Sequence, residues 1–137
     1  MAEEERGGTK VPPRRRIAAD EGRAAIAAWL AAREETGGEA TKLGRPLLAT
    51  AVRYTLEELA TRAPGNSVEV RVPPFGVAQC IEGPRHTRGT PPNVVESDAE
   101  TWLSLATGRI AWPEALASGK LSASGTRTDL SELLPLA

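Results

Sequence analysis

The chain has 137 residues, of which 40% are apolar and 4% aromatic, and its formal net charge is −1 at pH 7. This length and composition predict one soluble globular domain whose core is built mainly from Ala, Val and Leu. The near-zero charge gives no reason to expect nucleic-acid binding, and the single cysteine, Cys80, excludes an internal disulfide.

The start of the chain carries no recognisable targeting segment. Residues 1–16 combine charge, Gly and Pro with almost nothing apolar, which predicts a flexible tail ahead of a single domain at 17–137. They lack the apolar run of a signal peptide, and no stretch approaches the roughly 20 apolar residues of a membrane span. We therefore expect a cytoplasmic protein without an integral membrane segment.

An extra N-terminal helix is predicted over residues 17–36, which are rich in alanine and carry Trp29 on an apolar stripe. Trp29 would either close the open side of a sheet or dock on a partner, and the sequence does not separate these roles. Two adjacent glycines in 37–45 indicate a linker. The core of the domain is then expected at 46–137.

A second helix should begin near Pro46, since proline suits the first turn of a helix, and end at Pro64–Gly65. The pattern then changes to alternation in SVEVRV, residues 67–72, which is typical of a strand with one exposed face. FGVAQCIE, residues 75–82, predicts a second strand in a hairpin with the first. NVVE, residues 93–96, predicts a short third strand.

The remaining chain predicts two helices, a strand and a final short helix. SDAETWLSLATG starts with a capping box of Ser97 and Glu100 and ends at Gly108 in a left-handed conformation. WPEALASG repeats this arrangement with Pro113 and Gly119, KLSAS predicts a fourth strand, and TDLSELLPL predicts the last helix. Because strands and helices are segregated, we predict an α+β fold, with a mostly antiparallel sheet of four to five strands covered by helices.

The stretch ESDAETWLSLATGRIAWPEALASGKLSASGTRTDLSELLPL resembles the C-terminal half of the type-2 sterol carrier protein family. The resemblance is carried by an acidic helix start, an apolar helix that ends in glycine, a short Ala-Leu helix and a glycine-flanked strand, at Asp98, Leu103–Leu105, Gly108, Ala115–Leu116, Gly119–Lys120–Leu121 and Gly125. The chain is similar to small stand-alone bacterial relatives of that family. It is more distantly similar to the C-terminal domain of mycothiol-dependent maleylpyruvate isomerases, but it lacks the helical bundle that carries their metal.

The resemblance implies an apolar tunnel between a sheet and its covering helices that accepts fatty acyl chains, sterols or acyl-CoA. We therefore hypothesise a non-enzymatic binding module that carries a small apolar ligand. The side chains expected at the ligand are Leu48, Val52, Leu56, Phe75, Val77, Trp102, Leu105 and Leu116, with Arg85, His86 and Arg88 at the entrance.

These last three residues lie in GPRHTRGTPPN, a loop that holds the only histidine. Arg85, His86 and Arg88 could bind a carboxylate head group or the phosphate of CoA. The prolines could instead make the loop a stiff connector. The sequence leaves both interpretations open.

The sequence offers little for catalysis. One histidine and one cysteine cannot supply the three or four ligands of a zinc site, and no phosphate-binding glycine loop is present. We therefore predict no enzymatic activity, no metal and no cofactor. The alternative function is a ligand-free accessory or protein-interaction domain, acting through the N-terminal helix on a partner or in a homodimer.

Overall fold

The structure is a computed structural model that describes residues 15–36, 43–83, 93–126 and 128–136. Most of the predicted tail and linker, and the loop residues Arg85, His86 and Arg88, lie outside the described residues. No helix in these ranges is both long and apolar enough to cross a membrane.

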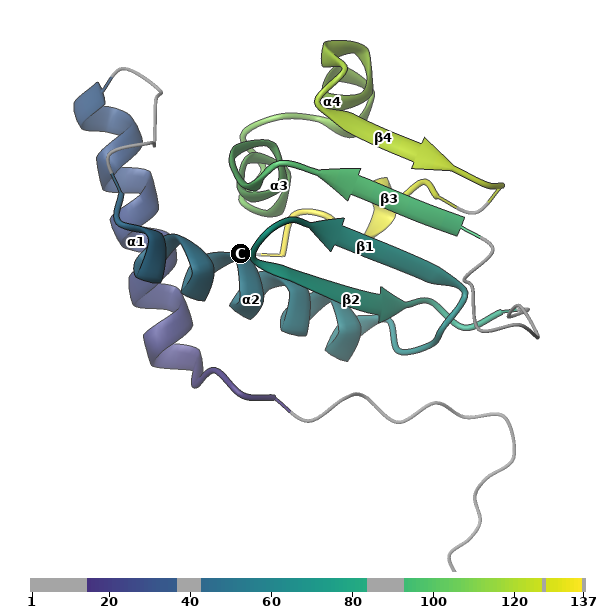
Figure 1. Cartoon of the computed structure of the whole chain (residues 1–137), viewed down its shortest axis with the longest axis horizontal. Coiled ribbons are helices and arrows are strands. Elements are labelled where there is room, and N and C mark those ends of the chain that lie inside the picture. Colours follow the sequence, from purple (N-terminus) through teal and green to yellow (C-terminus); the bar gives the residue numbers. More distant parts are fainter. Residues whose placement is uncertain (1–14, 37–42, 84–92, 127, 137) are drawn as a thin grey trace, which may run out of the picture.

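Two long helices precede the sheet, and two short ones follow its third strand (Figure 1). The elements are α1 (Ala19–Thr36), α2 (Arg45–Arg62), β1 (Val68–Val72), β2 (Gly76–Cys80), β3 (Asn93–Ser97), α3 (Ala99–Ala106), α4 (Trp112–Ser118), β4 (Leu121–Ser124) and the 3-10 turn η3 (Ser131–Leu133). The predicted α+β class, with an additional N-terminal helix, is confirmed.

The four strands form one mixed sheet in the order β2-β1-β3-β4. β1 is antiparallel to β2 but parallel to β3, and β3 is antiparallel to β4. The parallel pairing was not predicted. β2 ends beside Val68, where β1 begins, and β3 also begins beside Val68 on the free edge of β1, so β3 runs in the same direction as β1.

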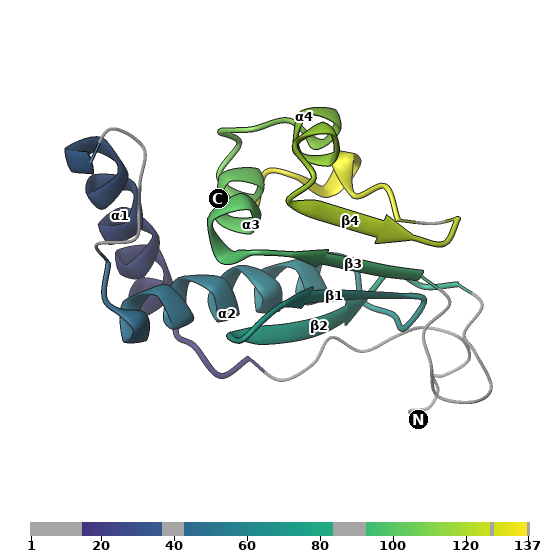
Figure 2. The ribbon, with the colours of Figure 1, turned by 45° about the horizontal axis from the view of Figure 1, so that its top comes forward.

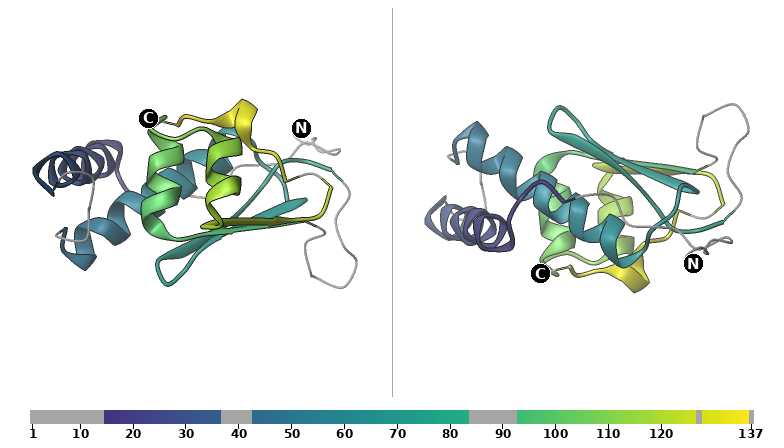
Figure 3. Two further views of the ribbon diagram at one scale, coloured as in Figure 1. Left: turned by 90° about the horizontal axis from the view of Figure 1, so that it is seen from above. Right: turned by 90° about the horizontal axis from the view of Figure 1, so that it is seen from below.

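One face of the sheet is covered and the other is exposed. Val68, Val70 and Val72 of β1 are fully buried, whereas Glu69 and Arg71 point to the opposite face. Figure 3 shows α2, α3 and α4 on the same side of the sheet. The alternation in SVEVRV therefore marks a strand with one face in the core, as predicted.

The additional helix α1 packs on α2 rather than on the sheet (Figure 2). Trp29 is fully buried in the core of its own chain, so its side chain is not on a docking surface. At the other end of α1, Gly22 lies against the ring of Tyr54. Arg33 forms an ion pair with Glu100 and thereby ties α1 to α3.

The cap of α3 differs from the prediction. Asp98 is the N-cap, and its side chain accepts a hydrogen bond of 2.7 Å from the backbone N–H of Thr101. The predicted box of Ser97 and Glu100 was wrong, because Ser97 is the last residue of β3 and is paired there with Leu121. The left-handed conformations predicted for two glycines are confirmed, with φ of 77° at Gly108 and 80° at Gly119.

The C-terminal segment closes the helical side of the core. Leu130 and Leu136 are buried, and the backbone N–H of Leu136 donates to the carbonyl of Ala106 at 2.7 Å. Arg62 at the end of α2 donates to the carbonyl of Leu136 at 2.8 Å. The predicted last helix is a single 3-10 turn, held by these contacts with α2 and α3.

Candidate binding groove

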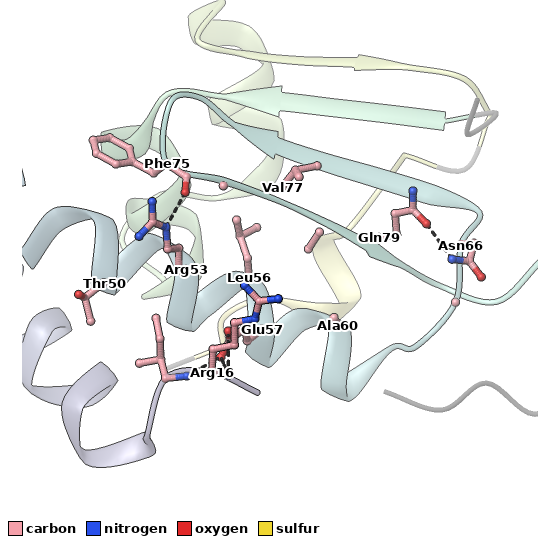
Figure 4. A pocket seen from close by; sticks show the side chains of 14 residues that line it. Arg16, Thr50, Arg53, Leu56, Glu57, Ala60, Asn66, Phe75, Val77 and Gln79 are labelled. Atoms are coloured by element: carbon pink, nitrogen blue, oxygen red, sulfur yellow. Dashed lines mark hydrogen bonds between the residues drawn. The ribbon is translucent and has the colours of Figure 1, made fainter. Parts of the chain in front are cut away.

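A groove with a volume of about 910 Å³ lies between α2 and the edge strand β2 (Figure 4). Small-molecule sites usually measure roughly 300–1,000 Å³, so a ligand of that class would fit. The groove is lined by apolar and polar side chains together with two glycines: Ile17, Leu56, Ala60, Phe75, Val77, Ala78, Arg16, Thr50, Arg53, Glu57, Asn66, Gln79, Gly65 and Gly76.

The small residues of β2 leave the space for this groove. Gly76 and Ala78 share the covered face of the sheet with Val72 and Val70, their partners in β1. A Cβ atom at Gly76 would stand 3.2 Å from a methyl carbon of Leu56, so the glycine lets strand and helix approach closely at this end. Farther along β2, the short side chain of Ala78 does not fill the gap to α2.

The groove has an apolar inner wall, polar side chains around it, and an opening to solvent. Leu56 and Ala60 of α2 are almost fully buried and form its inner wall, while Phe75 is half-buried. Val77 is 59% exposed but is paired with Arg71 on the opposite face of the strand, whereas the lining residues Arg16 and Arg53 are exposed on the side of α2. A ligand could therefore enter from solvent beside the arginines and bury apolar surface against α2.

Two guanidinium groups stand among the lining residues. Nε of Arg53 donates to the backbone carbonyl of Phe75 at 2.7 Å, and its two terminal nitrogens bond to no residue within the described ranges. The guanidinium of Arg16 forms no hydrogen bond or ion pair with any residue that the structure describes. The groove thus combines an apolar wall with guanidinium N–H groups that could donate hydrogen bonds to a ligand.

The segment before α1 is held against α2 by two adjacent carboxylates. The carboxylate of Glu57 accepts hydrogen bonds from the backbone N–H groups of Arg16 and Ile17 at 3.1 and 3.2 Å. Arg15 donates to Glu58 at 2.9 Å, and its guanidinium carbon lies 5.2 Å from the centre of the Tyr54 ring. These contacts place Arg16 and Ile17 on the wall of the groove.

The family of the chain is shown by a match to the model for bacterial SCP (sterol carrier protein) orthologs over residues 44–136. The chain belongs to this sterol-carrier-like family. No curated protein matches the chain at a significant level. The family region contains α2 and the whole sheet, so it supplies both walls of the groove. Arg16 and Ile17 come from outside it.

The residues expected at the ligand fall into three groups in this bacterial SCP ortholog. Leu56, Phe75 and Val77 line the groove. Val52, Trp102 and Leu105 are buried in the core, and Leu48 packs against the core while half-buried. Leu116 is 41% exposed on α4 and does not line the groove.

The groove lies at the edge of the sheet. At the centre of the sheet, side chains fill the space between the strands and the helices. The indole nitrogen of Trp102 donates to the hydroxyl of Thr55 at 2.8 Å, and both side chains are fully buried. Leu59 and Leu105 are packed into the same continuous core.

The polar residues that line the groove were not predicted from the sequence. Arg53, Glu57 and Ala60 follow one another at helical spacing beside Leu56, so they share one face of α2, and that spacing was a usable signal. No comparable signal exists for Arg16, because Glu57, the residue that its backbone contacts, is 41 residues away in the sequence.

The thiol of Cys80 is poorly placed to act as a nucleophile. Cys80 is fully buried in β2, and burial raises the pKa of its thiol to about 12, so it stays protonated near neutral pH. Across the described ranges, no group of three or more His, Cys, Asp or Glu side chains is arranged to hold a metal ion. The arrangement at α2 and β2 can enclose an apolar chain and donate hydrogen bonds.

Proposed function

We propose that this bacterial SCP ortholog is a non-enzymatic binding module that carries a small apolar ligand. A fatty acyl chain, a sterol-like molecule and an acyl-CoA are the candidate ligands. The observation that supports this most is the groove of about 910 Å³ between α2 and β2, with an apolar inner wall and an accessible edge. Membership in a sterol-carrier-like family points the same way.

The energetics of the groove suit a carrier. Burial of apolar surface contributes about 25 cal/mol per Å², so an aliphatic chain laid against Leu56, Ala60 and Ala78 would be bound without specific bonds. Because the lining residues Arg16 and Arg53 are exposed, the ligand could exchange with solvent without local unfolding. Reversible binding of this kind is what transfer of a ligand requires.

The test combines detection of a ligand with a variant that fills the groove. Native mass spectrometry of gently purified protein should show an added mass of a few hundred daltons, on the order of a drug-sized or lipid molecule, which denaturation releases. Ala78→Leu extends a side chain into the groove and should weaken binding of a fluorescent acyl-chain probe. Ala123→Leu is the control on the other edge strand, β4, because Ala123 is exposed there and does not line the groove.

A clean apo mass together with no binding of fatty acids, sterols or acyl-CoA would contradict the carrier function and favour a ligand-free accessory domain. Equal weakening of probe binding by Ala78→Leu and Ala123→Leu would place the ligand elsewhere. The thermal midpoints of both variants should be measured, and binding should be compared at a temperature where both variants are equally folded.

A further inference from the structure

We propose that the groove selects ligands with an anionic head group on an apolar chain, and that Arg16 and Arg53 bind this head group. The inference rests on the proposed carrier function and specifies its ligand. It also assigns a binding role to the segment before α1, because Arg16 precedes the family region at 44–136.

The balance of charge in the groove supports an anion. Among the described lining residues, Arg16 and Arg53 are cationic and Glu57 is the only acidic side chain. The oxygens of Glu57 already accept hydrogen bonds from the backbone of Arg16 and Ile17. The guanidinium groups could therefore donate to a bound carboxylate or phosphate, because the Glu57 carboxylate is already bonded to backbone N–H groups. Charge-assisted hydrogen bonds of this kind are among the stronger ones in proteins.

The two arginines border the same part of the groove. Arg53 and Glu57 are four residues apart on α2 and so are neighbours on one face of the helix. Because the backbone of Arg16 is bound by Glu57, Arg16 lies against the same face of α2 that carries Arg53. Arg15, the adjacent residue, is bound to Glu58, which leaves Arg16 as the side chain of this segment that is free to meet a ligand.

One end of the groove carries a charged side chain, and the other end carries uncharged polar side chains. Figure 4 shows Arg53 beside Phe75 at one end, and Asn66 beside Gln79 at the other. The amide of Asn66 donates to the side-chain oxygen of Gln79 at 2.7 Å, so these two uncharged groups satisfy each other. A ligand with a charged head group beside Arg53 and an uncharged chain along Leu56 would match this change from charged to uncharged lining.

The experiment uses the full chain and three ligands with the same chain, namely dodecanoate, dodecyl phosphate and dodecanol, each below its aggregation limit. The two anions should bind about fivefold more tightly than dodecanol, an advantage expected for partly exposed charge-assisted hydrogen bonds and one that added salt should reduce. Arg16→Gln and Arg53→Gln should each weaken binding of the anions and leave dodecanol binding unchanged. Arg23→Gln, an exposed arginine of α1 outside the groove, is the matched control.

The outcomes separate this inference from the carrier function. If dodecanol binds as tightly as the anions and the arginine variants change nothing, the head-group assignment is wrong and the carrier function stands. If Arg53→Gln acts and Arg16→Gln does not, the role of the segment before α1 is overturned. If none of the three ligands binds, both proposals fail. A preference between the two anions would identify carboxylate or phosphate as the natural head group.

Discussion

The indole N–H of Trp102 on α3 donates a hydrogen bond of 2.8 Å to the hydroxyl of Thr55 on α2. That hydroxyl directs its single proton toward the carbonyls of Ala51 and Val52, whose oxygens lie 2.9 and 2.8 Å from Oγ1. Both side chains are fully buried, so water cannot replace either partner. A single hydroxyl thus satisfies the largest polar side chain in the contact between α2 and α3.

Thr55→Val should destabilise the protein by about 1–3 kcal/mol, because it keeps the side-chain shape but leaves the buried indole N–H of Trp102 without an acceptor. The free energy of unfolding from urea titration measures this cost. Thr50→Val is the matched control, since Thr50 also donates to a carbonyl four residues back in α2 but accepts no buried donor. Equal losses for the two variants would show that the bond from Trp102 contributes nothing.

Gly22→Ala should also destabilise the protein, although alanine is the better helix former by about 1 kcal/mol. A Cβ atom at Gly22 would stand 2.1 Å from the nearest ring carbon of Tyr54, so α1 would have to move away from α2. We expect a net loss of about 1–3 kcal/mol in the free energy of unfolding, as for other overpacked contacts. A Cβ atom at Gly44, the N-cap of α2, would meet no atom closer than 3.8 Å, so Gly44→Ala should cost less than about 1 kcal/mol, the preference for Gly over Ala at an N-cap. A gain in stability from Gly22→Ala would contradict the close packing.

Glu58 and Glu100 should affect stability in opposite directions as the pH falls. Burial alone would raise the pKa of Glu58, but hydrogen bonds and charges of Arg62 and Arg15 outweigh it and hold this pKa below its ordinary value of 4.5. The carboxylate therefore stabilises the fold above pH 4.5, and this contribution is lost as the pH falls through the lowered value. Burial raises the pKa of Glu100 against the charge of Arg33, so its contribution is present at low pH and is lost as the pH rises through the raised value.

Two variants test this difference, Glu58→Gln and Glu100→Gln. Their free energies of unfolding in urea are compared with that of the wild type at neutral pH and at about pH 3.5. The cost of Glu58→Gln should shrink at the lower pH, where the wild-type carboxylate is partly protonated. The cost of Glu100→Gln should grow there, because the protonated wild-type side chain is then the favoured form. Costs that change in the same direction for both variants would refute the assignment.

Local sequence patterns predicted most elements and the antiparallel hairpin of β1 and β2, but not the parallel pairing of β1 with β3. The alternation around Val70 identifies a strand with one buried face, yet it is the same whether the neighbouring strand is parallel or antiparallel. The parallel pairing of β1 and β3 depends on which edge of β1 the hairpin leaves free. The cap of α3 was misplaced by one residue because Ser97 and Asp98 both suit an N-cap, and the pairing of Ser97 with Leu121 decides between them.

The candidate site was less predictable than the fold. Apolar periodicity shows that Val52 and Leu56 face inward, but it cannot show that one meets the core and the other a groove. That difference arises from the small residues of β2, which leave space beside Leu56. Arg16 reaches the groove only through contacts with residues on α2, far along the chain, and nothing local signals such an arrangement.

Cys80 should resist alkylation in the folded protein. Its side chain is fully buried on the covered face of β2, where it pairs with Val68, and burial raises the pKa of the thiol to about 12. Near pH 8 the reactive thiolate is then about a thousandfold scarcer than for an ordinary cysteine. Because Cys80 is the only cysteine in the sequence, iodoacetamide can add one carbamidomethyl group at most, and intact mass measures it directly. Labelling should be slow under native conditions and complete in denaturing urea. Rapid native labelling would show that β2 opens readily at the sheet edge, and the groove it borders would then lack a fixed wall.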